Sequence, residues 1–221
     1  MSDGFAQLID TANGFFAELR QSNTRDWFED RKAFYVAEIR KPAELLANLL
    51  AEDLARMTGK AHAPKVFRIY RDVRFSKDKT PYNTHLHMMW PRKDAEGAPL
   101  WFFGASPEYM TVGMGVMAAN GAALTRYRGF IDREGDAVAG AVAEAREVLG
   151  VEIGEWGPAP LKWVPKPYEP DHPHGDLLRR KALTVSAEPR EDWRSAGLIP
   201  GVTATMKGFM PLWRLMDAAF G

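Results

Sequence analysis

FRIYRDVRFSKDKTPYNTHLH, residues 67–87, is the stretch in which the chain changes from helical to strand-like patterning. Apolar and polar side chains alternate from Phe67 to Phe75, which is the two-residue period of a β-strand. SKDKTP then has the composition of a turn, and a second strand is expected at residues 85–90. The stretch therefore predicts a strand–turn–strand unit. Arg71 breaks its apolar register, so either a bulge lies there or the guanidinium points inward.

Patterns on both sides of this unit predict an α+β fold. Three amphipathic helices occupy residues 1–60, and further strands are expected at 100–105, 109–117 and 183–187. Helical patterns return at 122–131, at 137–149 and near the C-terminus, where Pro211 kinks or splits the last helix. We expect a largely antiparallel sheet of about four to six strands with the helices packed against it. The chain is interpreted as a single domain, 1–221, made of a helical segment (1–60), a strand-rich core with the basic stretch (65–118), and helices plus a proline-rich loop (119–221).

Composition narrows the classes of function. The 221 residues include no cysteine, which excludes disulfides and thiolate metal sites and fits a reducing compartment. Lys plus Arg and Asp plus Glu number 29 each, and this zero net charge argues against a dedicated nucleic-acid binder. We expect a cytoplasmic protein without a membrane partner, because no signal-like or spanning segment is evident. Nothing in the sequence indicates a cofactor or an oligomeric state.

The strongest site candidate lies within the strand–turn–strand unit. Between Lys65 and Lys79 there are six cations and two aspartates, a local balance of 6 − 2 = +4. Converging guanidinium groups, ammonium groups and hydroxyls bind phosphates and carboxylates, so the site would take an anionic small molecule. The candidate ligand-binding residues here are Arg68, Arg71, Arg74, Ser76, Lys77, Lys79, Tyr82 and His85. The alternative is a structural network that braces the turn, in which Asp72 pairs with Arg71 or Arg74 and Asp78 caps the turn while pairing with a flanking lysine.

Two His-x-His pairs allow a metal site. On a strand, residues two apart face the same side, so His85 and His87 could bind one ion, while His172 and His174 lie in a loop. A metal-dependent hydrolase built on these four histidines is therefore an alternative function. Surface or hydrogen-bonded histidines are the simpler interpretation.

Two further patterns receive structural interpretations. Gly113 and Gly115 resemble part of a dinucleotide fingerprint, but no acidic residue ends a second strand at the required distance, so close strand packing is favoured. Aromatic residues interleaved with lysines in the proline-rich loop could stack on bases or sugars, or simply attach the loop to the body: Trp156, Lys162, Trp163, Lys166 and Tyr168.

RIYRDVRFSKDKTPYNTH resembles the signature of an uncharacterised bacterial and fungal family, domain of unknown function 2461. NTRDWFEDRKAFY and PKPYEPDHPHGDLLRRKAL resemble two further segments of that family, so the resemblance covers nearly the whole chain. The residues that match the central signature are Arg68, Arg71, Asp72, Arg74, Phe75, Ser76, Lys77, Asp78, Lys79, Pro81 and Tyr82, and those that match the later one are Lys166, Asp171, His172 and Pro173. His87 and His174 fall outside the family pattern.

The resemblance implies no established activity, but it pairs two polar segments that one site could share. In that hypothesis the basic residues hold an anionic group and Lys166 adds a further cation. His172 is the candidate general base, with Asp171 or Asp72 as its partner. The predicted function is an enzyme or sensor for a phosphorylated or carboxylated small molecule. A non-catalytic nucleic-acid or protein-binding module is a further alternative.

Overall fold

The computed structural model describes residues 4–95, 97–116, 121–154, 158–190 and 192–220. The chain divides into two compact units. Unit 1 contains residues 1–90, 102–111 and 189–204, and unit 2 contains residues 91–101, 112–188 and 205–221. The single-domain interpretation stays a prediction.

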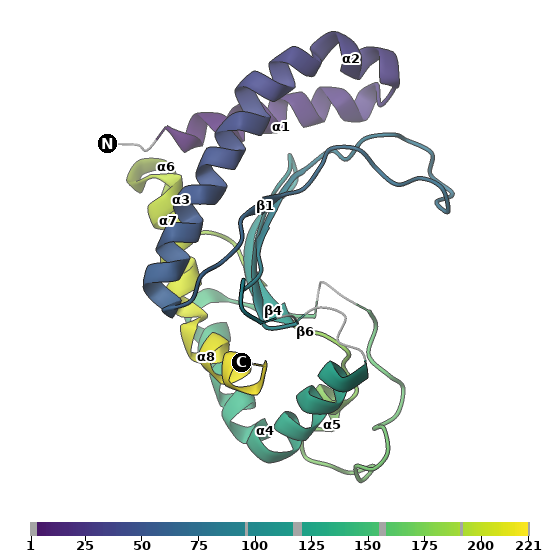
Figure 1. Ribbon diagram of the computed structural model, residues 1–221, viewed down its shortest axis with the longest axis vertical. Coiled ribbons are helices and arrows are strands. Elements are labelled where there is room, and N and C mark those ends of the chain that lie inside the picture. The colour runs from purple at the N-terminus through teal and green to yellow at the C-terminus, as the bar shows by residue number, and fades with distance from the viewer. Residues whose placement is uncertain (1–3, 96, 117–120, 155–157, 191, 221) are drawn as a thin grey trace. The chain divides into compact units, whose positions relative to one another are not determined.

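Unit 1 begins with the expected helical segment: α1 (Phe5–Gln21), α2 (Arg25–Phe34), the π-helical turn η1 (Tyr35–Arg40) and α3 (Lys41–Thr58) (Figure 1). The Thr24 side chain caps α2 by accepting a hydrogen bond from the backbone N–H of Trp27. Gly59 ends α3 in the left-handed conformation, with φ of 69°. These local signals are the ones that the sequence displays, which is why the helical boundaries lie close to the expected ones.

Aromatic side chains hold the N-terminal helices together. The Phe15 ring packs on Phe28 and Tyr35 with centroid distances of 6.4 and 5.5 Å. The Phe28 ring centroid in turn lies 4.3 Å from that of Tyr82, which belongs to the strand–turn–strand stretch at residues 67–87. The helical segment is therefore joined to the strand-rich segment through one aromatic cluster.

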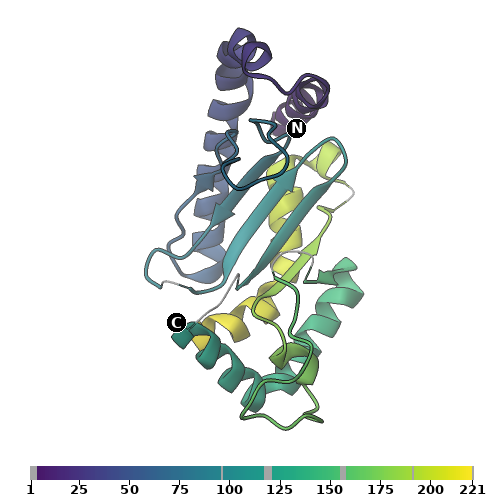
Figure 2. The same cartoon turned by 90° about the vertical axis from the view of Figure 1, so that its right-hand side faces the viewer.

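The strands form an antiparallel sheet in the order β1-β2-β3-β4-β6-β5, and the α+β prediction is confirmed (Figure 2). The strands are β1 (Lys65–Val66), β2 (Leu86–Trp90), β3 (Leu100–Ala105), β4 (Met110–Val116), β5 (Glu152–Ile153) and β6 (Leu183–Ala187). Two strands depart from expectation: β1 is confined to Lys65–Val66 while the expected strand at 67–75 does not form, and β5 was not expected.

Unit 1 also contains two helices near the C-terminus of the chain. Helix α6 (Trp193–Ala196) is a single turn, and α7 (Leu198–Gly208) follows it directly and ends in unit 2. The next helix, α8, begins at Met210. The C-terminal helical pattern is thus split just before Pro211, as expected.

In unit 2, α4 (Gly121–Leu149) replaces the two helices expected at 122–131 and 137–149. Its backbone leaves helical geometry at Glu134, with φ of −118° and ψ of 17°, so the helix is broken where the two patterns meet. Helix α8 (Met210–Phe220) packs against α4. The short helix α5 (Gly175–Leu178) follows the proline-rich loop.

Gly113 and Gly115 serve close strand packing in unit 2. A Cβ atom on Gly113 would lie 2.8 Å from the Val185 carbonyl oxygen, and one on Gly115 would lie 2.1 Å from that of Leu183. β4 and β6 are hydrogen-bonded along this stretch. The glycines are therefore explained by the approach of the neighbouring strand.

Within the described parts of the chain, no helix combines the length and the apolar character needed to cross a membrane.

Candidate functional site: the basic hairpin and the histidine segments

Residues 65–90 form a hairpin in unit 1 that we call the basic hairpin. β1 pairs with β2, and the two arms stay paired beyond the strands. The Phe67 N–H donates to the His87 carbonyl at 2.9 Å, and the Asn83 N–H donates to the Ile69 carbonyl at 2.7 Å. A single bridge then joins Tyr70 and Tyr82. The strand–turn–strand path is therefore correct, although its outer part is not regular strand.

Arg71 explains why the outer arms leave strand geometry. Its Nη1 donates to the Thr80 carbonyl at 3.1 Å and to Asp78 Oδ2 at 2.6 Å, and it also bonds the Thr80 hydroxyl. The Thr80 carbonyl is thus used by a side chain, and Pro81 has no N–H to donate to a ladder. The Arg71 side chain is 25% exposed and its guanidinium reaches across the hairpin to Asp78 and Thr80 of the turn.

Asp78 is the second member of this network. It accepts from the backbone N–H of Thr80 at 2.9 Å and pairs with Arg71. The Thr80 N–H, followed by Arg71 and the Thr80 hydroxyl, lowers the pKa of Asp78 to about 2. Asp78 therefore braces the turn as the structural interpretation expects, but its cation is Arg71 and not a flanking lysine.

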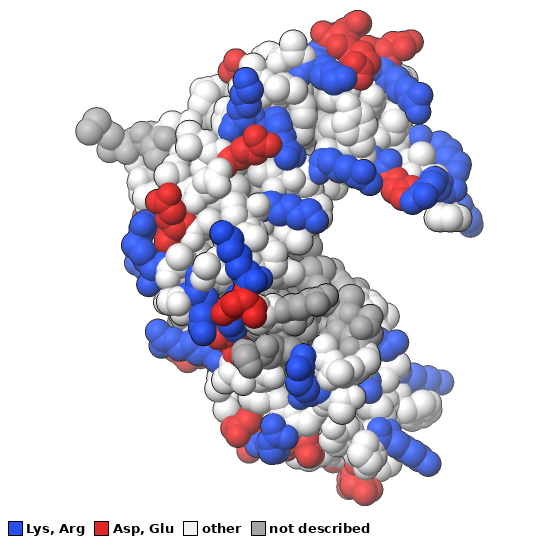
Figure 3. All heavy atoms as spheres, viewed as in Figure 1, with Lys and Arg blue, Asp and Glu red and all other residues white. Residues whose placement is uncertain are grey.

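The remaining cations of the hairpin differ in what holds them. Arg74 pairs with Asp72 at 2.7 Å, and this hydrogen bond lowers the pKa of Asp72. Lys79 Nζ donates to the Val73 carbonyl at 3.0 Å. Among the described residues, no ion pair joins a carboxylate to Lys65, Arg68, Lys77 or Lys79. Figure 3 shows Lys and Arg side chains gathered at the hairpin tip.

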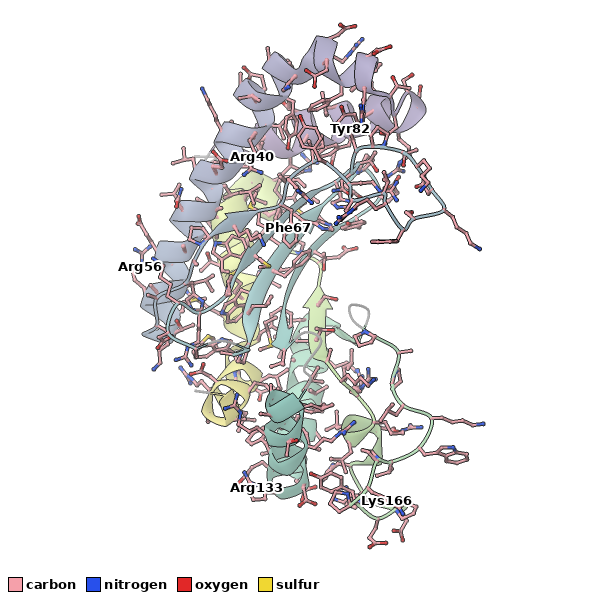
Figure 4. All side chains as sticks on the ribbon, turned by 45° about the vertical axis from the view of Figure 1, so that its right-hand side comes forward. Arg40, Arg56, Phe67, Tyr82, Arg133 and Lys166 are labelled. Carbon is pink, nitrogen blue, oxygen red and sulfur yellow. The ribbon has the colours of Figure 1, made fainter. Side chains whose placement is uncertain are left out.

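Two residues of the signature lie at opposite extremes of exposure. Tyr82 is buried beneath the hairpin against Phe28, and this burial raises its pKa (Figure 4). It supports the hairpin instead of forming an exposed aromatic wall. Phe75, at the tip, is 95% exposed, with the Arg74 guanidinium 5.9 Å from its ring centroid. Ser76 contributes to the turn through its N–H, which donates to the Val73 carbonyl at 3.3 Å.

His85 and His87 lie together on unit 1. Their rings stack with centroids 3.7 Å apart and an interplanar angle of 21°. His87 Nε2 lies 2.6 Å from the Tyr109 hydroxyl, a partner that the sequence analysis did not single out. Burial, assisted by His85, lowers the pKa of His87 to about 3, and burial followed by Arg71 lowers that of His85. Both imidazoles are therefore neutral at physiological pH.

His172 and His174 contact helix α4 in unit 2. His172 Nε2 lies 3.2 Å from Asp132, and His174 Nε2 lies 3.0 Å from Asp136. Gly135 leaves room for the His174 ring, because a Cβ atom there would lie 2.1 Å from His174 Cδ2. The partner of His172 is thus a helix carboxylate rather than Asp171 or Asp72.

Other residues of the proline-rich loop are mostly exposed. Asp171 and Lys166 face solvent, and Tyr168 lies edge-on to His172 at 6.3 Å. Trp163 is 74% exposed, with Lys162 Nζ 5.3 Å from its ring centroid. Trp156 lies outside the described residues.

The candidate residues therefore separate into two groups. Those of the basic hairpin, with His85 and His87, belong to unit 1, whereas Lys166, Asp171, His172 and His174 belong to unit 2. Across the ranges that the structure describes, no three His, Asp or Glu side chains are grouped so as to hold a metal ion.

A hollow of about 380 Å³ lies beside the base of the basic hairpin, between α3 and β1. Its cations include Arg40 and Lys65, but Arg40 already donates to the carbonyls of Val66 and Phe67 and pairs with Glu44. With Glu44 also in its lining, the hollow has no marked preference for an anion.

Several site residues carried weak signals in the sequence. Asp132 and Asp136 are one helical turn apart on α4 and each lies against one of the two histidines, but nothing in the sequence aligns the two segments. Gly135 falls between the two helical patterns expected at 122–131 and 137–149, where a glycine gives no sign of a close approach. Tyr109 was visible only as the start of a strand.

The fold and the hairpin define an α+β protein with an antiparallel sheet and a braced, cation-rich hairpin. A family model described as "Conserved hypothetical protein (DUF2461)" matches residues 11–214, and the chain belongs to that family. The resemblance found in the sequence is thereby confirmed. No curated protein matches the chain.

Proposed function

We propose that the protein binds a small molecule carrying a phosphate or carboxylate group, and that the basic hairpin is the binding element. The observation that carries this proposal is the distribution of ion pairs. Both carboxylates of the hairpin are used by arginines, Asp78 by Arg71 and Asp72 by Arg74. The excess of four positive charges has no carboxylate to neutralise it within the described part of the hairpin.

Arg71 adds donors of its own. Its three hydrogen bonds to Asp78 and Thr80 all start from Nη1. A guanidinium has five N–H donors, so Nη2 and Nε retain capacity for a ligand while Nη1 holds the arginine in place. A braced arginine loses little conformational freedom on binding, which favours the recognition of planar carboxylates and phosphates.

A thermal-shift assay on the full chain tests this proposal. Inorganic phosphate, ribose 5-phosphate and citrate are compared with ribose, the uncharged control. An anion at a hundred times its dissociation constant stabilises the folded protein by about 2.7 kcal/mol. We expect this stabilisation to be lost in the double variant Arg68→Ala/Lys77→Ala.

Lys207→Ala is the matched control, because Lys207 is exposed on α7 in unit 2. It should respond to the anions as the unmodified protein does. If no anion raises the melting temperature, or if the double variant responds like the control, the proposal is wrong.

A second candidate is a non-catalytic nucleic-acid-binding module. The exposed rings of Phe75 and Trp163, each beside a cation, favour it because such rings can stack on bases. Fluorescence anisotropy with a labelled single-stranded oligonucleotide at several salt concentrations tests this candidate. Affinity that falls steeply with salt supports it, and the absence of binding at low salt excludes it.

A further inference from the structure

Five rings form a surface on unit 1 that we call the aromatic patch: Phe67, His85, His87, Phe102 and Tyr109. His87 lies at its centre, 3.7 Å from the His85 centroid, 5.0 Å from Phe102 and 6.2 Å from Phe67. The Tyr109 hydroxyl holds the His87 ring by a hydrogen bond. Phe67 and Tyr109 are 38% and 39% exposed, so a ligand can reach the edges of the patch.

The patch lies on the face of β2 that points away from helix α3. Leu86, Met88 and Trp90 alternate with His87 along β2 and are buried, and Trp90 Nε1 donates to the Ala47 carbonyl on α3. Gly104 of β3 provides space for the His87 ring on the same face of the sheet as the patch. A Cβ atom there would lie 3.1 Å from His87 Cδ2.

Charge is arranged around the patch and not on it. Both imidazoles are neutral, so the patch itself carries no charge. Lys65 Nζ lies 5.5 Å from the Phe67 centroid, and Arg71 is the charged group that most affects His85. On the side of Tyr109, the charge of Arg20 is paired with Glu108.

From this arrangement we infer that the anionic ligand also carries a planar aromatic ring, which lies on the aromatic patch while its phosphate group meets the cations of the basic hairpin. The chemical class that combines these two features is a free nucleoside monophosphate. This inference rests on the proposed anion-binding function and adds the ring to it. Bases stack favourably on aromatic side chains because every base has a π-face.

The arms of the hairpin place the two parts of such a ligand next to each other. Lys65 and Phe67 are two residues apart on one arm, and Phe67 N–H bonds the carbonyl of His87 on the other. Lys65 Nζ lies 5.5 Å from the Phe67 ring centroid, so a ligand ring on the Phe67 side of the patch has a cation of the hairpin at its border.

Isothermal titration calorimetry on the full chain tests the inference with AMP, GMP, CMP, UMP and ribose 5-phosphate. We expect at least one nucleotide to bind about tenfold or more tightly than ribose 5-phosphate, which has the phosphate but no base. Phe67→Ala should abolish this preference and leave the affinity for ribose 5-phosphate unchanged. Phe67→Leu, which keeps an apolar side chain and supports folding, should have the same effect.

Phe75→Ala is the matched control, because Phe75 belongs to the same hairpin but lies at its exposed tip. It should leave nucleotide binding unchanged. If ribose 5-phosphate binds as tightly as every nucleotide, the inferred ring site is wrong while the anion site stands. If none of the five compounds binds, the phosphate form of the proposed function fails as well, and the citrate arm of the thermal-shift assay decides the carboxylate form. If an oligonucleotide binds more than tenfold more tightly than each nucleotide, the free nucleotide is the wrong class.

Discussion

At the scale of single residues, Arg71 shows how one side chain can serve both structure and recognition. The sequence marked it as a residue on the wrong face of a strand, and left open whether it bound a ligand or braced the turn. The structure gives it three bonds from Nη1 within the hairpin and leaves its other nitrogens available. Periodicity could indicate that Arg71 was exceptional, but not which acceptors it meets, since Thr80 and Asp78 reach it only after the turn has formed.

Replacing Arg71 should weaken the fold of the hairpin. Arg71→Ala leaves Asp78 without its cation and the Thr80 carbonyl without its side-chain donor. Because these groups are exposed, we expect a loss of about 1 kcal/mol in the free energy of unfolding. Urea denaturation measures this loss. Lys77→Ala, in the same hairpin, should change stability by less than about 0.5 kcal/mol. Equal effects of the two variants would show that the Arg71 network does not stabilise the hairpin.

His87 should make the protein less stable as the pH falls. Its pKa is about 3 when folded, against an ordinary value of 6.5, so between these pH values the unfolded chain binds a proton that the folded chain does not. Acidification therefore favours unfolding, by at most about 1.4 kcal/mol per pH unit from this group. The lowered pKa of His85 acts in the same direction below pH 6.5.

Urea denaturation between pH 7 and about pH 4.5 measures this dependence. His87→Gln, which retains a hydrogen-bonding side chain, should flatten the slope. Asp78 interferes little in this range, because its pKa is about 2 in the folded protein against an ordinary 3.8, so its own effect on stability falls mainly below pH 4.5. An unchanged slope in the variant would contradict a neutral, buried His87.

At the scale of elements, local patterns predicted most helices and strands because their causes are local. The bounds of β3 and β6 and the aromatic faces of α1 and α2 follow from periodicity and capping. The expected strand at 67–75 was too long. Beyond the hydrogen bond from the Arg71 N–H to the Pro81 carbonyl, the Thr80 carbonyl is taken by the Arg71 side chain and Pro81 has no N–H to donate. The docking of the His172 segment on α4 was not predictable, since it depends on how distant segments pack.

Gly135→Ala should detach that segment from α4. The new Cβ atom would overlap the His174 ring, so His174 must move and its contact with Asp136 is lost. We expect a loss of about 1–3 kcal/mol in stability, with faster hydrogen exchange in residues 170–178. Gly140→Ala is the matched control on the same helix, because its Cβ atom meets nothing within 4 Å.

The control should stabilise the protein slightly, by up to about 1 kcal/mol, because alanine favours helix more than glycine does. If both glycine variants behave alike, steric exclusion by the His174 ring is not the reason for Gly135.

At the scale of the whole molecule, the zero net charge distinguishes a small anionic ligand from nucleic acid. A chain with 29 positive and 29 negative side chains has little long-range attraction for a polyanion, so recognition depends on the local excess in the basic hairpin. The sequence displayed both the balance and the local excess. It could not show that the carboxylates of the hairpin are already paired.

Salt should therefore weaken ligand binding only moderately. The hairpin cations are exposed, and raising the ionic strength from about 0.1 M to about 1 M shortens the screening length from about 10 to about 3 Å. We expect the affinity for ribose 5-phosphate to fall less than about tenfold over this range. Calorimetric titrations at several salt concentrations measure this change, and a loss of about a thousandfold would indicate the many phosphate contacts of a polyanion instead.

The most direct test of the central claim is an NMR titration of the ¹⁵N-labelled full chain with inorganic phosphate. Backbone amides and arginine side-chain N–H groups report where the anion binds. If the basic hairpin is the anion site, the saturable shifts are concentrated in residues 65–87 and include the Arg71 guanidinium. Shifts confined to other parts of the chain, or no saturable shift at all, would contradict it.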